Sequence, residues 1–149
     1  MHREFPETPL MGVGAVVVDR GRVLLVRRGR EPMRGAWTLP GGLLEVGETL
    51  LSGVAREVLE ETGLIVKPIE LVELLERIHR EHERIQYHYV IADYLCLVVG
   101  GELHASSDAD ALRWAERAEW LAADAELDAV TVRVMEAGWQ RARVMRQGD

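Results

Sequence analysis

Three glutamates within five positions form the stretch of the sequence best suited to chemistry, because residues 56–63 read REVLEETG. A helix turns by about 100° per residue, so Glu57, Glu60 and Glu61 would share an arc of roughly 100°. Glu57 and Glu61 repel one another at i,i+4, and only Arg56, at i,i+4 to Glu60, offers local compensation. The arc also lies near the expected C-terminus of the helix, where the helix dipole disfavours anions. A stretch that carries both penalties is expected to bind a cation.

The donor atoms limit the kind of cation. Carboxylates are hard oxygen ligands, and no histidine or cysteine lies nearby in the sequence. Such a set favours Mg²⁺ or Mn²⁺ over zinc. The alternative is a solvated helix face without a ligand, and the two electrostatic penalties count against it.

These carboxylates belong to a helix expected over residues 49–62, with Gly63 as its C-cap. Apolar or small side chains recur on one side at helical spacing, at Leu51, Val54, Ala55, Val58 and Thr62. The helix is therefore expected to bury that side and to carry the carboxylates along its border.

The remaining elements follow from hydrophobic patterning. Strands are expected over residues 10–18, 22–28, 65–80 and 85–99, and a second amphipathic helix over residues 128–146. Residues 29–42 are expected to form a long loop, Pro68 to break the third strand, and Gly100–Gly101 to form a turn. Trp114 is expected to begin or end another short strand. The order of strands, helix, strands and helix predicts a mixed α/β sandwich.

Residues upstream of the helix complete a longer motif, which reads G-LLEVG-E-TLLSGVA-REVLEETGL from Gly42. It resembles the Nudix hydrolase signature G-x5-E-x7-R-E-U-x-E-E-x-G-U, in which U is aliphatic. Every fixed position matches: Gly42, Glu48, Arg56, Glu57, Glu60, Glu61 and Gly63. The segments LLVRR and WTLPGG are similar to the MutT-like branch of the family. The resemblance implies a Nudix-type α/β/α sandwich with a mixed central sheet, as a single domain over residues 1–149.

The resemblance also implies an activity, the hydrolysis of a phosphoanhydride bond in a nucleoside diphosphate linked to another group X. Mg²⁺ is the implied cofactor, with Mn²⁺ as an alternative. The implied metal ligands are Glu57, Glu60, Glu61 and the carbonyl of Gly41, and Arg56 would orient the glutamates. Glu48 would bind metal, position the nucleophile, or only stabilise the first helical turn.

The general base stays open between two places in the sequence. Glu57 is one candidate. The other is the polar loop ASSDAD, in which Asp108 and Asp110 precede Trp114. A plain polar turn is the alternative interpretation of these two aspartates.

Candidate substrate contacts lie before the signature. Arg27 and Arg28 point to opposite faces of their strand, so one is expected to reach the substrate phosphates. Trp37 would stack on a base or pack beside Pro40. Two substrate classes remain: nucleoside triphosphates, and ADP-ribose or nucleotide sugars. The second remains although the segment RIHREHER lacks the proline that ADP-ribose hydrolases of the family often carry.

Composition excludes several classes of partner. The net charge of −7 argues against nucleic-acid binding, and no apolar run is long enough to span a bilayer. The single cysteine, Cys96, excludes an internal disulfide, favours a buried position and is consistent with the cytoplasm. The helix over residues 128–146 packs on the sheet or forms a homodimer interface. A non-catalytic Nudix module that senses a nucleotide or a protein is the rival to an enzyme, and the complete set of signature carboxylates favours the enzyme.

Overall fold

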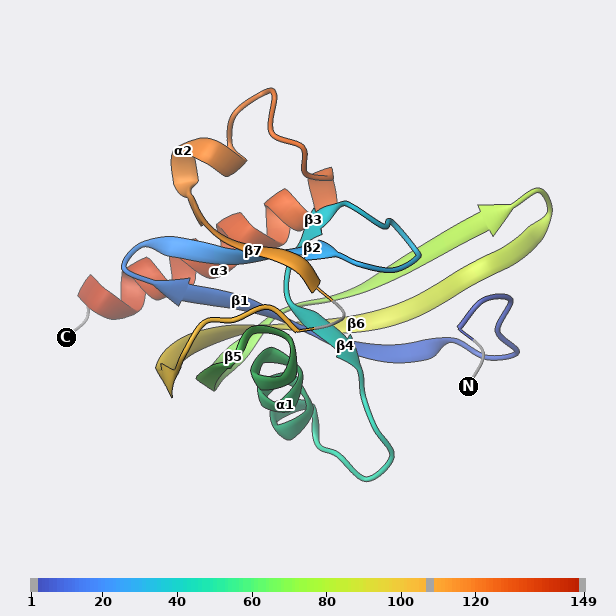
Figure 1. Ribbon diagram of the computed structural model, residues 1–149, viewed down its shortest axis with the longest axis horizontal. Coiled ribbons are helices and arrows are strands. Elements are labelled where there is room, and N and C mark those ends of the chain that lie inside the picture. Colours follow the sequence, from blue (N-terminus) through green and yellow to red (C-terminus); the bar gives the residue numbers. More distant parts are fainter. Residues whose placement is uncertain (1–2, 107–108, 148–149) are drawn as a thin grey trace.

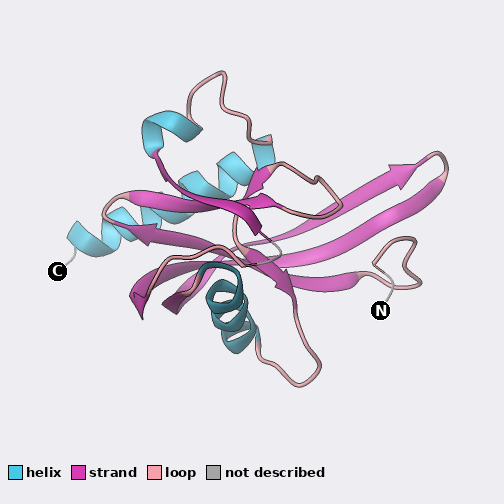
Figure 2. Ribbon diagram, viewed as in Figure 1, coloured by secondary structure: helices cyan, strands magenta, loops and turns pink. Residues whose placement is uncertain are grey.

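One mixed β-sheet runs through the molecule, with helices on both faces (Figures 1 and 2). The structure is a computed structural model that describes residues 3–106 and 109–147. The strands are β1 (Leu10–Asp19), β2 (Arg22–Arg28), β3 (Trp37–Thr38), β4 (Gly41–Leu43), β5 (Leu64–Glu81), β6 (Arg84–Gly101) and β7 (Ala109–Glu116). The helices are α1 (Leu50–Thr62), α2 (Arg117–Trp120) and α3 (Ala129–Gln147).

Strand β1 is the central strand, and its two edges are used differently. One edge pairs in parallel with β6 from Leu10 to Val18, and β6 pairs with β5 in a long antiparallel hairpin that extends beyond the helices (Figure 1). The other edge is shared, because β4 pairs with residues 12–14 and β2 pairs near Val18 and Asp19. Strands β3 and β7 flank β2. The shared edge lets β2 and β4 diverge from one another.

Alternation along β1 supplies the two halves of the core. Val13, Ala15 and Val17 pack with α1 on one face, and Val16 and Val18 pack with α3 on the other. Figure 1 shows α1 and α3 on opposite sides of the sheet. The predicted α/β/α sandwich with a mixed central sheet is therefore confirmed.

Helix α1 begins one residue later than predicted and ends at the predicted residue, Thr62. Thr49 caps its N-terminus by accepting a hydrogen bond from the Ser52 N–H, and Gly63 ends it in the left-handed conformation with φ of 79°. Val54 and Val58 are fully buried, as predicted. The prediction for Leu51 is wrong, because 51% of this residue is exposed at the start of the helix.

Several expected boundaries are also wrong. The loop over residues 29–42 contains β3 and the start of β4, which form through pairing with distant strands. Pro68 does not break β5, because a register shift between Pro68 and Glu70 accommodates it as a bulge. Gly100 and Gly101 lie at the end of β6, opposite Ile65 and Leu64, and form no separate turn. Trp114 lies inside β7.

The second predicted helix is confirmed as α3, which begins one residue later than expected. Cys96 is buried, as predicted, and burial raises the pKa of its thiol to about 12. Among the described residues, no helix has the length and apolar character needed to cross a membrane.

Candidate active site

The carboxylate side of α1 lies against β4. The Gly41 N–H donates a hydrogen bond of 3.3 Å to Oε1 of Glu61. Gly42 lies so close to Glu57 that a methyl group in place of its hydrogen would overlap the carboxylate. Gly42 therefore lets β4 approach Glu57 more closely than a side chain would permit, and Gly41 lets β4 lie against the backbone of β1.

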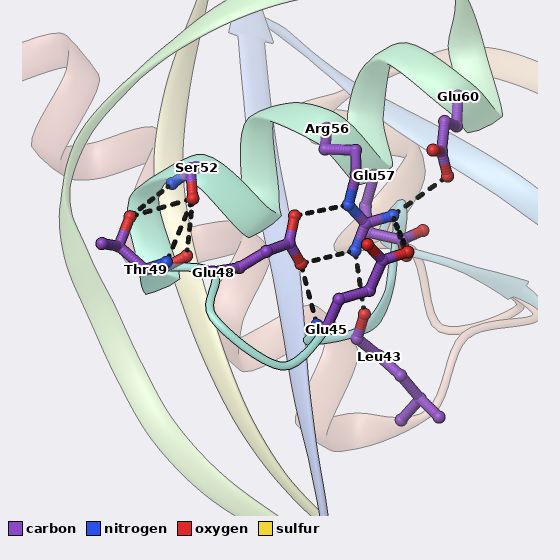
Figure 3. A network of polar contacts seen from close by, with 8 residues as sticks. All are labelled: Leu43, Glu45, Glu48, Thr49, Ser52, Arg56, Glu57 and Glu60. Atoms are coloured by element: carbon purple, nitrogen blue, oxygen red, sulfur yellow. Dashed lines mark hydrogen bonds and ion pairs between the residues drawn. The ribbon is translucent and has the colours of Figure 1, made fainter. Parts of the chain in front are cut away.

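Arg56 joins three glutamates of the signature, Glu48, Glu57 and Glu60 (Figure 3). Its Nε and Nη2 donate to the two oxygens of Glu48, at 2.6 and 2.8 Å. Its Nη1 donates to Glu57 at 2.9 Å and to Glu60 at 3.0 Å, and Nη2 also donates to the Leu43 carbonyl at 3.0 Å. A planar guanidinium with five N–H donors suits this task. One arginine thus offsets the repulsion among three carboxylates.

The glutamates differ in their electrostatic surroundings. The hydrogen bonds from Arg56 lower the pKa of Glu48 to about 2, and the Glu45 N–H adds to this effect. Burial raises the pKa of Glu57, although Arg56 opposes the shift. Arg56 itself has a raised pKa because of its hydrogen bonds to Glu48, so it stays charged. Glu48 therefore holds Arg56 in place, while Glu57 has the higher affinity for a proton.

A cavity of about 250 Å³, here called the carboxylate cavity, lies between α1, β4 and the end of β2. Glu57, Glu60 and Glu61 all line it. Arg28 also lines it; burial lowers the pKa of Arg28, and the charge of Glu61 opposes that shift. Arg3 and Arg30 line it as well, so the cavity brings three anionic side chains together with three arginines.

A second cavity of about 140 Å³, here called the sheet–α3 cavity, lies between β1, β6 and the start of α3. Much of its wall is apolar, from Leu39, Pro40, Ile91, Val130 and Val134. Arg28, Thr38, Leu39, Gly41 and Gly42 line both cavities, so the two share a wall. One bound molecule can therefore occupy both.

Polar side chains line the far end of the sheet–α3 cavity. Nη2 of Arg77 donates to Asp128 at 3.2 Å and to Oγ1 of Thr131 at 3.1 Å. Asp128 also accepts from the Thr131 N–H at 2.9 Å, which caps α3. Asp93 of β6 lines the same cavity and is only 6% exposed.

The chemistry of the carboxylate cavity fits a divalent cation. Its donors are oxygens, from Glu57, Glu60, Glu61 and the backbone at Gly41, and these suit Mg²⁺ or Mn²⁺. In residues 3–106 and 109–147, however, no three acidic, histidine or cysteine side chains converge closely enough to hold a metal. The reason is visible in the contacts, since Glu60 turns toward Arg56 and Glu61 toward Gly41. The donors fit the ion in type, and hydrogen bonds keep them apart.

The predicted substrate contacts separate into two groups. Arg28 lines both cavities. Arg27 lies 4.0 Å from Asp110 and stacks over Trp37, which packs on the core beneath α3. Arg27, Trp37 and Asp110 line neither cavity, which gives no support to substrate or base roles for them. Asp108 lies outside the described residues.

Sequence reasoning missed the polar residues of the sheet–α3 cavity. Asp93 could have been recognised from the sequence as a candidate functional residue, because it is the one charged residue in the apolar run YVIADYLCLVV. A buried charge in such a run is rare unless it is paired or functional. Arg77 and Asp128 lie 51 positions apart, so only the fold brings them together.

Comparison with known proteins agrees with this geometry. A family model described as NUDIX domain matches residues 8–137. The chain belongs to the NUDIX family. The resemblance to the Nudix hydrolases is thereby confirmed.

Individual relatives of this NUDIX protein carry hydrolase names. An ADP-ribose pyrophosphatase of Methanocaldococcus jannaschii is 38% identical over 68% of this chain and 58% of its own length. This chain thus matches less than two thirds of that relative. A MutT-like protein of Streptomyces ambofaciens is 38% identical over 75% of this chain and 68% of its own length.

A solved structure supports the same assignment. The MutT NUDIX hydrolase from Burkholderia pseudomallei is 30% identical and superposes with a TM-score of 0.72, over 88% of this chain and 98% of that one. The predicted similarity to the MutT-like branch is confirmed, and the expectation of a hydrolase agrees with these names.

Proposed function

We propose that this NUDIX protein hydrolyses a phosphoanhydride bond in a nucleoside diphosphate linked to a second group, with Mg²⁺ as its cofactor. The observation that carries the proposal is the wall shared by the carboxylate cavity and the sheet–α3 cavity. A nucleotide substrate needs a cation-binding site for its diphosphate next to a largely apolar site for its base. In this proposal the carboxylate cavity takes the diphosphate and its cation, and the adjoining sheet–α3 cavity takes the base.

Each glutamate has a distinct part in the proposal. Glu57, Glu60, Glu61 and the Gly41 carbonyl hold the cation, for which Mn²⁺ is the alternative. A bound divalent cation supplies charge neutralisation and Lewis-acid activation of water. Glu57 is also the proposed general base, because its carboxylate has a raised pKa inside the cavity.

The flanking residues position these groups. Arg28 lines the carboxylate cavity together with the glutamates and binds the substrate phosphates. Arg56 is a positioning residue, since its donors are used by carboxylates and a carbonyl. Glu48 positions Arg56 and is no base, because both of its oxygens accept hydrogen bonds and its pKa is about 2.

ADP-ribose is the first substrate to test, because the Methanocaldococcus relative is named an ADP-ribose pyrophosphatase. Nucleoside triphosphates are the second, because two of the compared proteins carry MutT names. The test incubates the purified chain with ADP-ribose, nucleotide sugars and nucleoside triphosphates in Mg²⁺ and identifies the products by ion-exchange chromatography. Release of a nucleoside monophosphate, abolished by EDTA, is expected.

Glu57→Gln tests the proposed site in the same experiment, because it removes one negative charge and keeps the shape of the side chain. Its turnover is expected to be lower than that of the wild-type chain. Turnover that persists undiminished in this variant would contradict the proposed site. If the wild-type chain binds nucleotides but cleaves none of the panel, the protein is a sensing module and the proposed function is wrong.

A further inference from the structure

Asp93 is a buried acid in β6. Its side chain lines the sheet–α3 cavity and the residue is 6% exposed. Within the described part of the chain, no hydrogen bond or ion pair reaches its carboxyl group. An unpaired polar group inside a protein costs free energy, so its retention calls for a ligand or another compensation.

The strand beside Asp93 leaves room for this carboxyl group. Gly14 of β1 lies directly opposite Asp93 in the parallel ladder. A methyl group at Gly14 would overlap Oδ1 of Asp93. Two positions far apart in the sequence therefore combine to hold one carboxyl group at the wall of the cavity.

Burial also determines the protonation state of Asp93. It raises the pKa of the carboxyl to about 7, with Arg77 lowering and Glu73 raising it to a smaller extent. A protonated carboxyl offers one O–H donor beside one carbonyl acceptor. It thus matches a ligand edge that presents one acceptor and one donor side by side.

The other residues of the sheet–α3 cavity restrict the class of ligand that can bind beside Asp93. Leu39, Ile91 and Val134 supply apolar surface suited to a flat ring. The wall shared with the carboxylate cavity requires that this ring be attached to a phosphate-bearing chain. A nucleobase meets both conditions.

We propose that Asp93 is a specificity-determining residue, which recognises the base of the substrate through a paired donor and acceptor on one ring edge. This inference rests on the proposed function for the identity of the substrate. Gly14 is the positioning residue that permits the contact. Adenine offers such an edge through its exocyclic amine and the adjacent ring nitrogen.

The test compares two substrates that differ only at this edge. One carries adenine, and the other carries purine, which lacks the exocyclic amine. Steady-state hydrolysis by the wild-type chain is expected to favour adenine by about tenfold or more in kcat/KM, mainly through KM. Asp93→Leu is expected to bring the preference close to onefold, because leucine has similar size and no polar group.

Asp93→Asn is the conservative variant, because its amide also presents a donor beside an acceptor. It is expected to keep the adenine preference within about threefold of wild type. Glu70→Gln is the matched control, since Glu70 pairs with Arg141 away from both cavities, and it is expected to leave the preference unchanged. A merely structural role for Asp93 would change stability and leave the preference between the two bases intact.

The outcomes separate this inference from the proposed function. If wild type cleaves both substrates equally, or Asp93→Leu keeps the wild-type preference, the inference is wrong and the function stands. If wild type cleaves neither substrate, isothermal titration calorimetry measures how tightly the chain binds the two nucleoside monophosphates, one with adenine and one with purine. Tighter binding of the adenine compound, lost in Asp93→Leu, would support Asp93 in the absence of hydrolysis, and the absence of binding would overturn both proposals.

Discussion

Arg56 explains how neighbouring carboxylates coexist beside and along helix α1. Its guanidinium contacts Glu48, Glu57 and Glu60, so the repulsion evident in the sequence is offset within the chain itself. Glu61 is held separately, by the backbone of β4. Because these hydrogen bonds turn Glu60 toward Arg56 and Glu61 toward Gly41, both side chains must reorient to bind one cation together.

The proposed metal ligands make a prediction at the scale of single residues. Glu57→Gln and Glu61→Gln each remove one negative charge from the carboxylate cavity, so both are expected to lower kcat by about 10²-fold or more. Isothermal titration with Mg²⁺ is expected to show weaker binding, while circular dichroism stays unchanged. Glu83→Gln, in the exposed turn between β5 and β6, is the control. Wild-type rates in both site variants would contradict the metal assignment.

Asp93 makes a second prediction, on the pH dependence of stability. The folded-state pKa of about 7 lies above the ordinary value of 3.8 for an aspartate, so between these pH values the folded chain holds a proton that the unfolded chain loses. Its contribution to stability is therefore fully present at low pH and is lost as the pH rises toward 7. Arg77 and Glu73 act on its charge, and the other ionisable groups that line the same cavity include Arg3, Arg28, His79 and Asp128.

Asp93→Asn removes this titration and is expected to be more stable than wild type at pH 8, by up to about 4 kcal/mol. The difference in free energy of unfolding should grow from pH 4 to pH 7 and then level off. Urea denaturation of both proteins across this range measures it. A difference that does not change with pH would show that Asp93 ionises normally in the folded chain.

At the scale of elements, the contact between β4 and α1 controls the geometry of the site. Gly42→Ala would push the Glu57 carboxylate away from the strand, so a loss of about tenfold or more in kcat is expected. Gly100→Ala is the matched control, because its new methyl group would meet Ile65 at an ordinary 3.7 Å. Equal effects of the two substitutions on turnover would argue against a tight contact at Gly42.

The elements that sequence could predict are those specified by neighbouring residues. Helix α1 depends on its caps, Thr49 and Gly63, and on the spacing of its own apolar residues. The Nudix signature in the sequence placed Glu57, Glu60 and Glu61 on this helix. Strands β3 and β4 were missed because two or three residues carry no period, and distant partners create them. The separation of Arg28 from Arg27 and Trp37 also depends on tertiary packing, as does the isolation of Asp93.

At the scale of the whole molecule, a bound cation is expected to stabilise the fold. Free Mg²⁺ at 100 times its Kd adds about 2.7 kcal/mol, which raises the melting temperature of a chain this size by about 5 to 10 °C. Differential scanning calorimetry with Mg²⁺ and with EDTA measures the shift, and NaCl at equal ionic strength is the control. The shift should disappear in Glu57→Gln. A Mg²⁺ shift of the same size in that variant would place the cation elsewhere.

The parallel pairing of β1 with β6 has a consequence for folding kinetics. It joins Leu10 to Tyr89, whereas the β5–β6 hairpin closes through a short turn. Loop closure makes the long-range pairing the slower of the two to form. Gly14 and Asp93 face one another across that pairing, so the sheet–α3 cavity is completed only when β1 docks. A nucleotide bound there should therefore slow unfolding and leave the rate of refolding unchanged.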